Sequence, residues 1–199
     1  REKGRDMRNT CRNGILLTAA AMFAFGGSLL FAQANTKKGD DPNNTGVAAK
    51  TSATDAKFAK EAAIGGMTEV EMGKIAIKNA SNEKVKQFGQ RMIDDHSKAA
   101  GELKSVAAKD NITLPTELDA KHKTMVDKYS ALTGTAFDRA YMKDMVKDHE
   151  TDVADFQKES NAGSNYDLKN WAGTTLPTLQ EHLRVAKDTE SSLGIRSSK

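Results

Sequence analysis

Apolar residues recur every three or four positions along most of the chain from residue 54 onward, a spacing typical of amphipathic α-helices. The pattern predicts helices over residues 54–80, 83–110, 117–133, 136–160 and 165–191. Thr54, Thr116 and Thr135 are the predicted N-caps of the first, third and fourth. No segment alternates with a period of two over the length of a strand, so no sheet is expected. Long helices joined mostly by short links predict an all-α, antiparallel four-helix bundle with an additional short helix.

Residues 1–34 have the pattern of a few upstream residues followed by a secretory signal peptide. Arg8 and Arg12 form a positively charged region, an apolar stretch covers residues 15–31, and residues 32–34 read Ala-Gln-Ala, a typical cleavage site. We therefore expect a periplasmic or otherwise exported protein. An uncleaved N-terminal anchor is the alternative, because the apolar stretch is long for a signal peptide.

Removal of residues 1–34 changes the charge of the chain. They carry five of the 30 lysines and arginines and two of the 27 acids, which leaves 25 of each and no net charge. This balance does not support nucleic-acid binding. Cys11 is the only cysteine, so the mature chain can form no disulfide and offer no thiolate ligand. Residues 35–53 are polar and predict a flexible linker before a bundle domain of residues 54–193. No stable membrane insertion is expected after cleavage, and an envelope partner remains open.

Each of the four long helices carries one ionisable residue near the middle of its apolar stripe. These residues are Glu69, His96, His149 and His182. Each lies within four residues of its predicted helix midpoint, an offset of at most roughly 6 Å along the axis. In an up-and-down bundle, the four side chains would therefore converge on one point of the core. Three imidazoles and one carboxylate suit zinc, iron or copper better than calcium or magnesium. The pattern thus predicts a site for a single transition metal ion.

Two other interpretations stand beside the metal site. A histidine on a helical stripe is more often a hydrogen-bonded core residue than a ligand, so the alternative is a non-catalytic envelope structural or interaction protein with a metal-free polar cluster. An enzyme is less favoured, because no second ligand set and no Ser/His/Asp arrangement stands out. His122 lies among lysines and is expected at a solvated boundary. Asp95 and Asp148 adjoin histidines and are expected to be solvated or to orient the imidazole rings.

The second and fourth predicted helices share a pattern at a constant offset of 53 residues. The shared positions place an aromatic residue, methionine, aspartate and histidine on corresponding faces. This repeat suggests two related helical hairpins that face each other. The matched pairs are Phe88 with Tyr141, Met92 with Met145, Asp95 with Asp148, His96 with His149, and Leu103 with Phe156.

Five short motifs together resemble the bacterial, exported domain-of-unknown-function family 4142. They read EVEMG at 69–73, MIDDH at 92–96, FDRAY at 137–141, DHE at 148–150 and LPTLQEH at 176–182. The resemblance covers residues 54–191 and implies a ferritin-like bundle, but no established activity.

The ferritin di-iron pattern is not reproduced. That pattern places Glu-x-x-His on two helices, whereas Ile93 precedes His96 and Val146 precedes His149 at the required position. The sequence therefore favours a single metal ion over di-iron chemistry.

Overall fold

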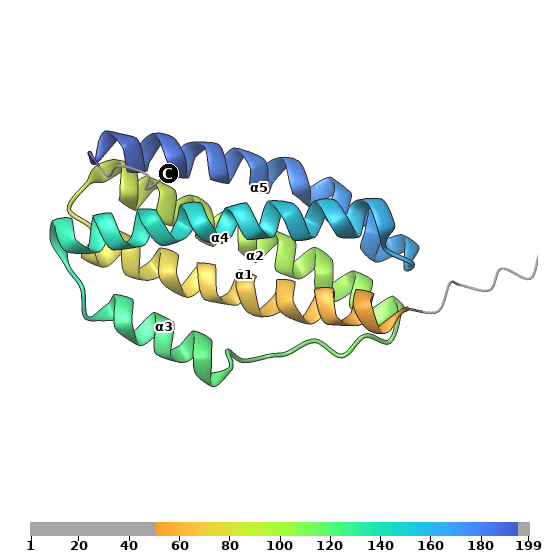
Figure 1. Ribbon diagram of the computed structural model, residues 1–199. Coiled ribbons are helices and arrows are strands. Elements are labelled where there is room, and N and C mark those ends of the chain that lie inside the picture. The colour runs from red at the N-terminus through yellow and green to blue at the C-terminus, as the bar shows by residue number, and fades with distance from the viewer. Residues whose placement is uncertain (1–50, 195–199) are drawn as a thin grey trace, which may run out of the picture. The chain divides into compact units, whose positions relative to one another are not determined.

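The structure is a computed structural model that describes residues 51–194, and this part of the chain contains five α-helices and no strand (Figure 1). The prediction of four long helices and one short helix is confirmed. No helix among residues 51–194 is long and apolar enough to cross a membrane. The predicted signal peptide and residues 35–50 of the predicted linker lie outside the described residues. The helices are α1 (Ala53–Asn79), α2 (Glu83–Lys109), α3 (Ala120–Ser130), α4 (Gly134–Ala162) and α5 (Tyr166–Ser192).

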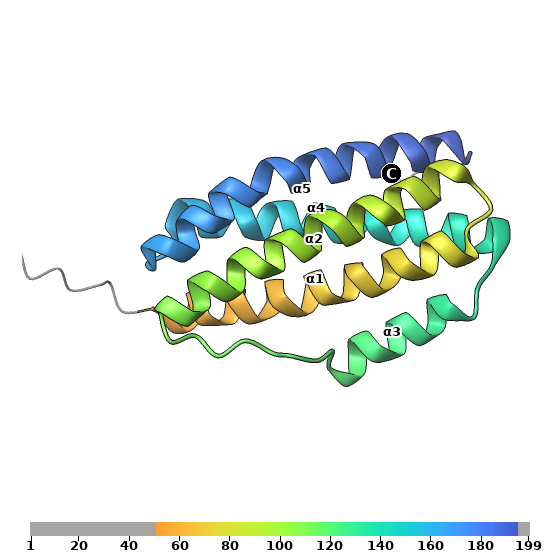
Figure 2. The same cartoon turned by 180° about the vertical axis from the view of Figure 1, so that it is seen from behind.

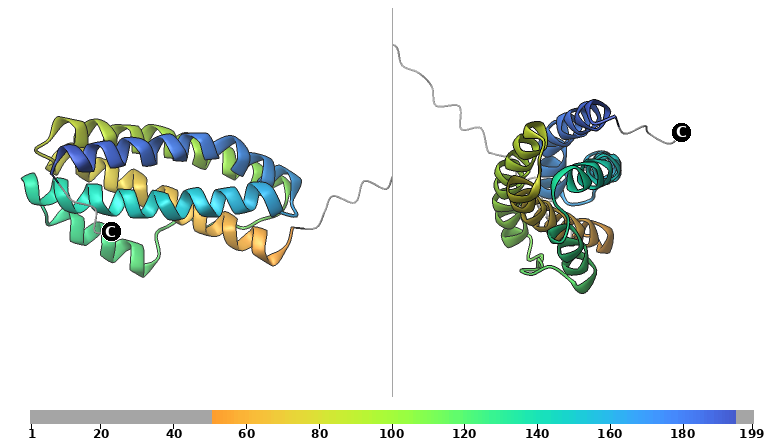
Figure 3. Two further views of the ribbon diagram at one scale, coloured as in Figure 1. Left: turned by 45° about the horizontal axis from the view of Figure 1, so that its top comes forward. Right: turned by 90° about the vertical axis from the view of Figure 1, so that its left-hand side faces the viewer.

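The four long helices form two antiparallel hairpins, α1–α2 and α4–α5, which pack side by side (Figures 1 and 2). Residues 110–133, including α3, return along the length of the bundle, so α4 starts at the end where α2 also starts. In the end-on view the long helices surround a common axis, and α3 lies outside them against α1 (Figure 3). One long crossover between two hairpins is the connectivity of ferritin-like bundles.

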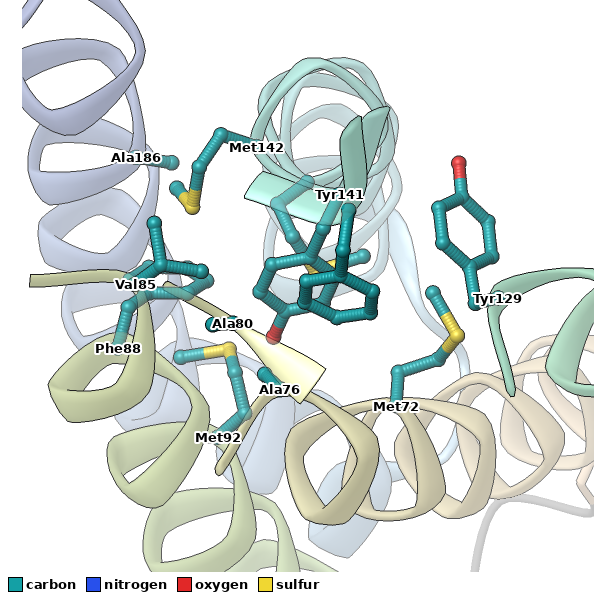
Figure 4. Packing of buried hydrophobic residues seen from close by; sticks show 12 residues of the cluster. Met72, Ala76, Ala80, Val85, Phe88, Met92, Tyr129, Tyr141, Met142 and Ala186 are labelled. Atoms are coloured by element: carbon teal, nitrogen blue, oxygen red, sulfur yellow. The ribbon is translucent and has the colours of Figure 1, made fainter. Parts of the chain in front are cut away.

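The apolar core consists of two clusters at different heights along the bundle. One contains Met72, Phe88, Met92 and Tyr141 and lies toward the α1–α2 loop (Figure 4). The other contains Leu103, Phe156, Leu168 and Trp171 and lies toward the α4–α5 loop. On every long helix the ionisable mid-stripe residue falls between the residues that enter one cluster and those that enter the other. The core is therefore divided by a buried polar layer.

Two glycines let α1 and α2 approach closely within the first hairpin. A Cβ added to Gly73 would lie 2.5 Å from the backbone oxygen of Gly89. A Cβ added to Gly89 would lie 2.7 Å from the Cβ of Ala76. Real side chains do not tolerate such contacts, so this crossing depends on both glycines. It lies directly beside the polar layer, one turn beyond Glu69.

Each hairpin holds the loop of the other through a buried aspartate. The Asp138 carboxylate on α4 accepts hydrogen bonds from the backbone N–H groups of Ser81 and Asn82, at 3.1 and 3.0 Å, in the α1–α2 loop. Asp55 on α1 accepts the corresponding bonds from residues 164 and 165 of the α4–α5 loop, at 3.2 and 3.0 Å. These Asp and Ser-Asn motifs repeat at an offset of 83 residues, which relates α1 to α4 and α2 to α5. The 53-residue repeat instead relates α2 to α4. The first of these is the second helix of its hairpin, and the other is the first helix of its hairpin.

The predicted N-caps are wrong at three helices. Ser52, not Thr54, caps α1, because its side chain and that of Asp55 form a reciprocal capping box. Asp119, not Thr116, caps α3 by accepting the N–H of His122 at 2.9 Å. The N-cap of α4 is Thr133 rather than Thr135, since α4 begins at Gly134. These shifts are small for the long helices, whereas the crossover helix is shorter than predicted at both ends and has 11 residues.

Candidate metal centre

The four mid-stripe residues meet in the polar layer, one from each long helix. Glu69 comes from α1, His96 from α2, His149 from α4 and His182 from α5. Their exposed fractions are 1%, 7%, 0% and 0%, respectively. The centroids of the three imidazole rings lie 5.3–6.0 Å apart. The axial positions worked out from the sequence therefore place these residues at one level, and the fold brings their side chains into contact.

The protonation of His149 follows from a backbone contact. Its Nδ1 lies 2.9 Å from the carbonyl oxygen of Met145, which can only accept a hydrogen bond. Burial, together with the neighbouring His182, lowers the pKa of His149 to about 4, so the ring is neutral at physiological pH. A neutral ring that donates from Nδ1 has an unprotonated Nε2. His149 therefore presents a lone pair to the centre of the bundle.

His182 is oriented in the opposite sense by Asp95 on α2. The His182 Nε2 lies 2.7 Å from Asp95 Oδ2. Burial raises the pKa of Asp95, but hydrogen bonds from His182 and Arg91 more than offset this effect and leave that pKa lowered. Burial also lowers the pKa of His182 despite the aspartate. The neutral ring therefore donates from Nε2 and presents the Nδ1 lone pair to the centre. Asp95 performs the orienting role expected for an acid beside these histidines.

The two lone pairs face each other. His149 Nε2 and His182 Nδ1 are 3.4 Å apart, and neither carries a proton to share. A tetrahedral ion with metal–nitrogen distances of about 2.05 Å would hold two such nitrogens about 3.35 Å apart. Glu69 Oε1 lies 3.3 Å from His149 Nε2, close to the same ligand–ligand spacing. His149 Nε2 therefore lies at a ligand–ligand spacing from both His182 Nδ1 and Glu69 Oε1, and one nitrogen from each of His96, His149 and His182 lies within 4.8 Å of the other two.

Glu69 and His96 complete the layer without forming a hydrogen bond. Glu69 Oε2 lies 3.0 Å from His96 Nδ1, but the contact is not aligned as a hydrogen bond. Both Glu69 oxygens and His96 Nε2 lack a hydrogen-bond partner among the described residues. Burial raises the pKa of Glu69 well above its usual value, and Asp152 and Asp148 raise it further. Burial and the other two histidines lower the pKa of His96 to about 3. Unpaired polar atoms of this kind are costly inside a protein.

A second set of possible ligands includes an acid that the stripe pattern missed. Glu69, Asp148 and Asp152 each offer one carboxylate oxygen, and these oxygens all lie within 4.8 Å of one another. Asp152 follows Asp148 by one helical turn on α4. Burial raises the pKa of Asp152 to about 8, and Asp148 and Asp155 contribute in the same direction. The available sequence signal was the 83-residue offset, which relates Asp152 to Glu69.

A groove between α2 and α5 borders the centre on the side of His96 and His182. This groove has a volume of about 280 Å³, and its lining includes Asp95, His96 and His182. On the other side of His96 a small cavity of about 30 Å³ is bordered by Glu69, Asp152 and apolar side chains. A volume of that size accommodates one or two waters. His96 therefore borders both a surface groove and a small cavity beside Glu69.

His122, the fourth histidine, takes no part in this arrangement. It lies on α3, and its Nδ1 is 2.7 Å from Asp119 Oδ1 at the surface. The expected boundary position of His122 is therefore correct.

Comparison with known proteins places the chain in a family. Residues 41–189 match the family described as Domain of unknown function (DUF4142). The chain belongs to the DUF4142 family. This result agrees with the resemblance carried by the five sequence motifs. No curated protein gives a significant match to the DUF4142 chain.

Two crystal structures share the fold of this DUF4142 chain. A DUF305 fragment from Deinococcus radiodurans is 12% identical, with a TM-score of 0.60, over 72% of this chain and 97% of that one. A DUF305 protein from Streptomyces coelicolor is 17% identical, with a TM-score of 0.62, over 76% and 98%. At these identities the similarity extends to the helical fold alone. The function must therefore be argued from the residues of the polar layer.

Proposed function

We propose that this protein binds a transition metal ion in the cell envelope through His96, His149 and His182, with Glu69 as the fourth ligand. The proposal rests above all on the facing lone pairs of His149 and His182, 3.4 Å apart. Both rings have their other nitrogen engaged by an acceptor, Met145 or Asp95, so neither can donate to the other. A cation between the rings satisfies both nitrogens at once.

The ligand set indicates the class of metal. Three imidazoles and one carboxylate suit zinc, iron or copper, whereas calcium and magnesium prefer oxygen ligands throughout. The low pKa of the buried histidines keeps them unprotonated and available as ligands at neutral pH. Glu69 supplies one negative charge, which a divalent cation would neutralise inside the core. The buried carboxylate has no partner among the described residues that could do so.

The groove between α2 and α5 supports reversible binding rather than a permanently enclosed ion. It leads from the surface to His96 and His182, and Asp95 lies at its wall. An exported protein with such a site would bind and exchange metal in the envelope. Export itself follows from the predicted signal peptide of residues 1–34, and it is part of the proposal.

Metal binding is tested directly on the purified chain. Zinc, copper(II) and iron(II) are titrated against a chromophoric chelator, and metal content is measured by mass spectrometry. We expect close to one equivalent of a transition metal per chain at the histidine site. His149→Ala and His182→Ala should lose it, whereas His122→Ala, which changes a histidine outside the layer, should bind like wild type.

The thermal stability gives a second readout. A ligand present at 100 times its dissociation constant stabilises the folded state by about 2.7 kcal/mol. The melting temperature of wild type should therefore rise with metal, and that of His149→Ala should not. If no metal binds and chelators leave the melting temperature unchanged, the layer is a metal-free structural cluster and the proposal fails.

A further inference from the structure

The three carboxylates beside the histidines form an arrangement that one metal site does not explain. Glu69 projects from α1, while Asp148 and Asp152 project from successive turns of α4. One oxygen from each lies within 4.8 Å of the other two. A cation with metal–oxygen distances of about 2.0–2.6 Å keeps its oxygens within about 4.0–5.2 Å of one another. The three oxygens are thus close enough to share one ion.

An independent observation concerns the burial of Glu69. Glu69 is 1% exposed, and neither of its carboxylate oxygens has a hydrogen-bond partner among residues 51–194. One oxygen, Oε1, lies 3.3 Å from His149 Nε2, and the other, Oε2, lies 3.0 Å from His96 Nδ1. A carboxylate has two lone pairs on each oxygen, so each oxygen can serve a further ligand. Glu69 therefore has unused acceptor capacity on a carboxylate that contacts two histidines and has one oxygen within 4.8 Å of the two aspartates.

Asp152 is partly buried beside Glu69 and Asp148, so three carboxylates share one small region of the bundle. Asp148 is exposed, so the acidic group opens to solvent on the α4 side. A cation held there would keep some of its water ligands. Hard divalent cations such as Mn²⁺ and Mg²⁺ are bound in this way, by a few carboxylates and several waters.

The symmetry of the fold places one acid from each hairpin in this group. The 83-residue offset that relates the two loop-holding aspartates also relates Glu69 on α1 to Asp152 on α4. The two carboxylates thus approach the bundle axis at the same level from opposite hairpins. Bundles commonly build metal sites from facing helices in this manner.

We infer that Glu69, Asp148 and Asp152 form a second, all-oxygen cation subsite next to the histidine site, with Glu69 bridging the two ions. This inference rests on the proposed function, because Glu69 is shared. The histidine site takes a nitrogen-preferring metal such as zinc, and the acidic subsite takes a hard divalent cation such as Mn²⁺. The centre is then dinuclear, and its two positions differ in ligand chemistry.

The test uses zinc to fill the histidine site and manganese to probe the acidic one. The purified chain is loaded with one equivalent of zinc, checked by mass spectrometry, and titrated with Mn²⁺. Electron paramagnetic resonance at room temperature measures the Mn²⁺ that remains free. Wild type should bind one equivalent of Mn²⁺ in addition to zinc. Asp148→Asn/Asp152→Asn should keep its zinc and bind Mn²⁺ at least tenfold more weakly.

A matched control removes the same number of charges elsewhere on the bundle. Glu61→Gln/Glu150→Gln changes two exposed acids outside the group, and it should bind both metals like wild type. Circular dichroism first establishes that each variant is folded. The single variant Asp148→Asn replaces an exposed residue and provides the comparison if the double variant does not fold.

Each outcome separates this inference from the proposed function. If wild type holds zinc but no Mn²⁺, or if the aspartate variants bind Mn²⁺ as well as the control does, the acidic subsite is refuted and the histidine site stands. If zinc binding is absent or survives His149→Ala, the proposed function fails instead. In wild type loaded with Mn²⁺ at both positions, a spin-coupled spectrum would support the Glu69 bridge, and two independent six-line spectra would contradict it.

Discussion

Replacing Glu69 by glutamine removes a buried negative charge while keeping the size and shape of the side chain. In the metal-free protein, this carboxylate has no hydrogen-bond partner among the described residues. Burial and the neighbouring aspartates raise its pKa well above the usual 4.5. Folding above pH 4.5 must therefore either bury an anion or take up a proton. Glutamine does neither, so Glu69→Gln should stabilise the metal-free protein.

The sign of the pH dependence follows from the raised pKa. The contribution of Glu69 to stability is fully present below pH 4.5 and is lost as the pH rises through the folded-state pKa. Wild type and Glu69→Gln should therefore be equally stable near pH 4, and the variant should gain an advantage at higher pH. At pH 7.5 we expect about 1–3 kcal/mol, the usual penalty of an unsatisfied buried polar group. For a domain of this size that corresponds to roughly 3–10 °C in melting temperature.

Metal should offset this advantage of the variant. Loss of a residue that supports a ligand commonly reduces metal affinity about 10–100-fold, which is roughly 1.4–2.7 kcal/mol, and loss of the ligand Glu69 itself should cost at least as much. With zinc in excess, wild type should gain more stability than Glu69→Gln, and the difference between their melting temperatures should shrink or change sign. The two requirements on Glu69 conflict: the residue lowers the stability of the metal-free protein and raises the affinity for metal.

Thermal unfolding followed by circular dichroism between pH 4 and 8, with chelator or with zinc, measures both effects. Glu71→Gln on the same helix is the matched control, because Glu71 pairs with Lys74 at the surface, and its replacement should change stability by less than about 0.5 kcal/mol. A metal-free Glu69→Gln protein that melts below wild type at pH 7.5 would refute the reasoning. Glu69 would then be a stabilising partner of His96, as a purely structural cluster requires.

Three further predictions concern packing, loop anchoring and ligand orientation. Gly89→Ala should lower the free energy of unfolding by about 1–3 kcal/mol, because its Cβ would lie 2.7 Å from the Cβ of Ala76. Gly101→Ala on the same helix meets open space and should raise the free energy of unfolding by up to about 1 kcal/mol; chemical denaturation measures both. Asp138→Ala should lose about 2–4 kcal/mol in the same assay, since it leaves the α1–α2 loop donors without their buried acceptor. Asp95→Asn should weaken zinc binding about 10–100-fold in chelator competition, because His182 loses the carboxylate that fixes its tautomer. Asp94→Asn, at the exposed neighbouring position, should leave zinc binding unchanged.

The helices were predictable because their signal is local. Apolar spacing of three and four residues identified all five, and short links predicted the antiparallel hairpins. The caps were less predictable, because several Ser, Thr and Asp residues stand near each helix start and only one forms the capping bond. Ser52 prevails over Thr54 because Asp55 lies at the position that completes a capping box. At α3, Asp119 provides the bond and Thr116 lies in the crossover segment.

The candidate site was partly predictable for the same reason. Helix geometry fixes the height and the face of each residue, so Glu69, His96, His149 and His182 could be assigned to one level. Asp152 was missed because the stripe was continued from His149 to Val153, although the spacing 149–152–156 also places Asp152 on the inward side of α4. Its approach to Glu69 depends on which helix becomes the neighbour of α4, and the periodicity of α4 alone does not contain that information.

The sequence by itself determined five helices, two hairpins and a polar layer at mid-height, because rise per residue and side-chain direction are properties of each helix alone. The tertiary structure alone decided which nitrogen His182 directs inward, because that depends on Asp95 reaching His182 across 87 residues of sequence. The contact that orients His149 is local by comparison, since the Met145 carbonyl lies one turn earlier on the same helix. The tertiary structure also decided that the carboxylates of α1 and α4 approach each other, because the long crossover makes these two helices neighbours.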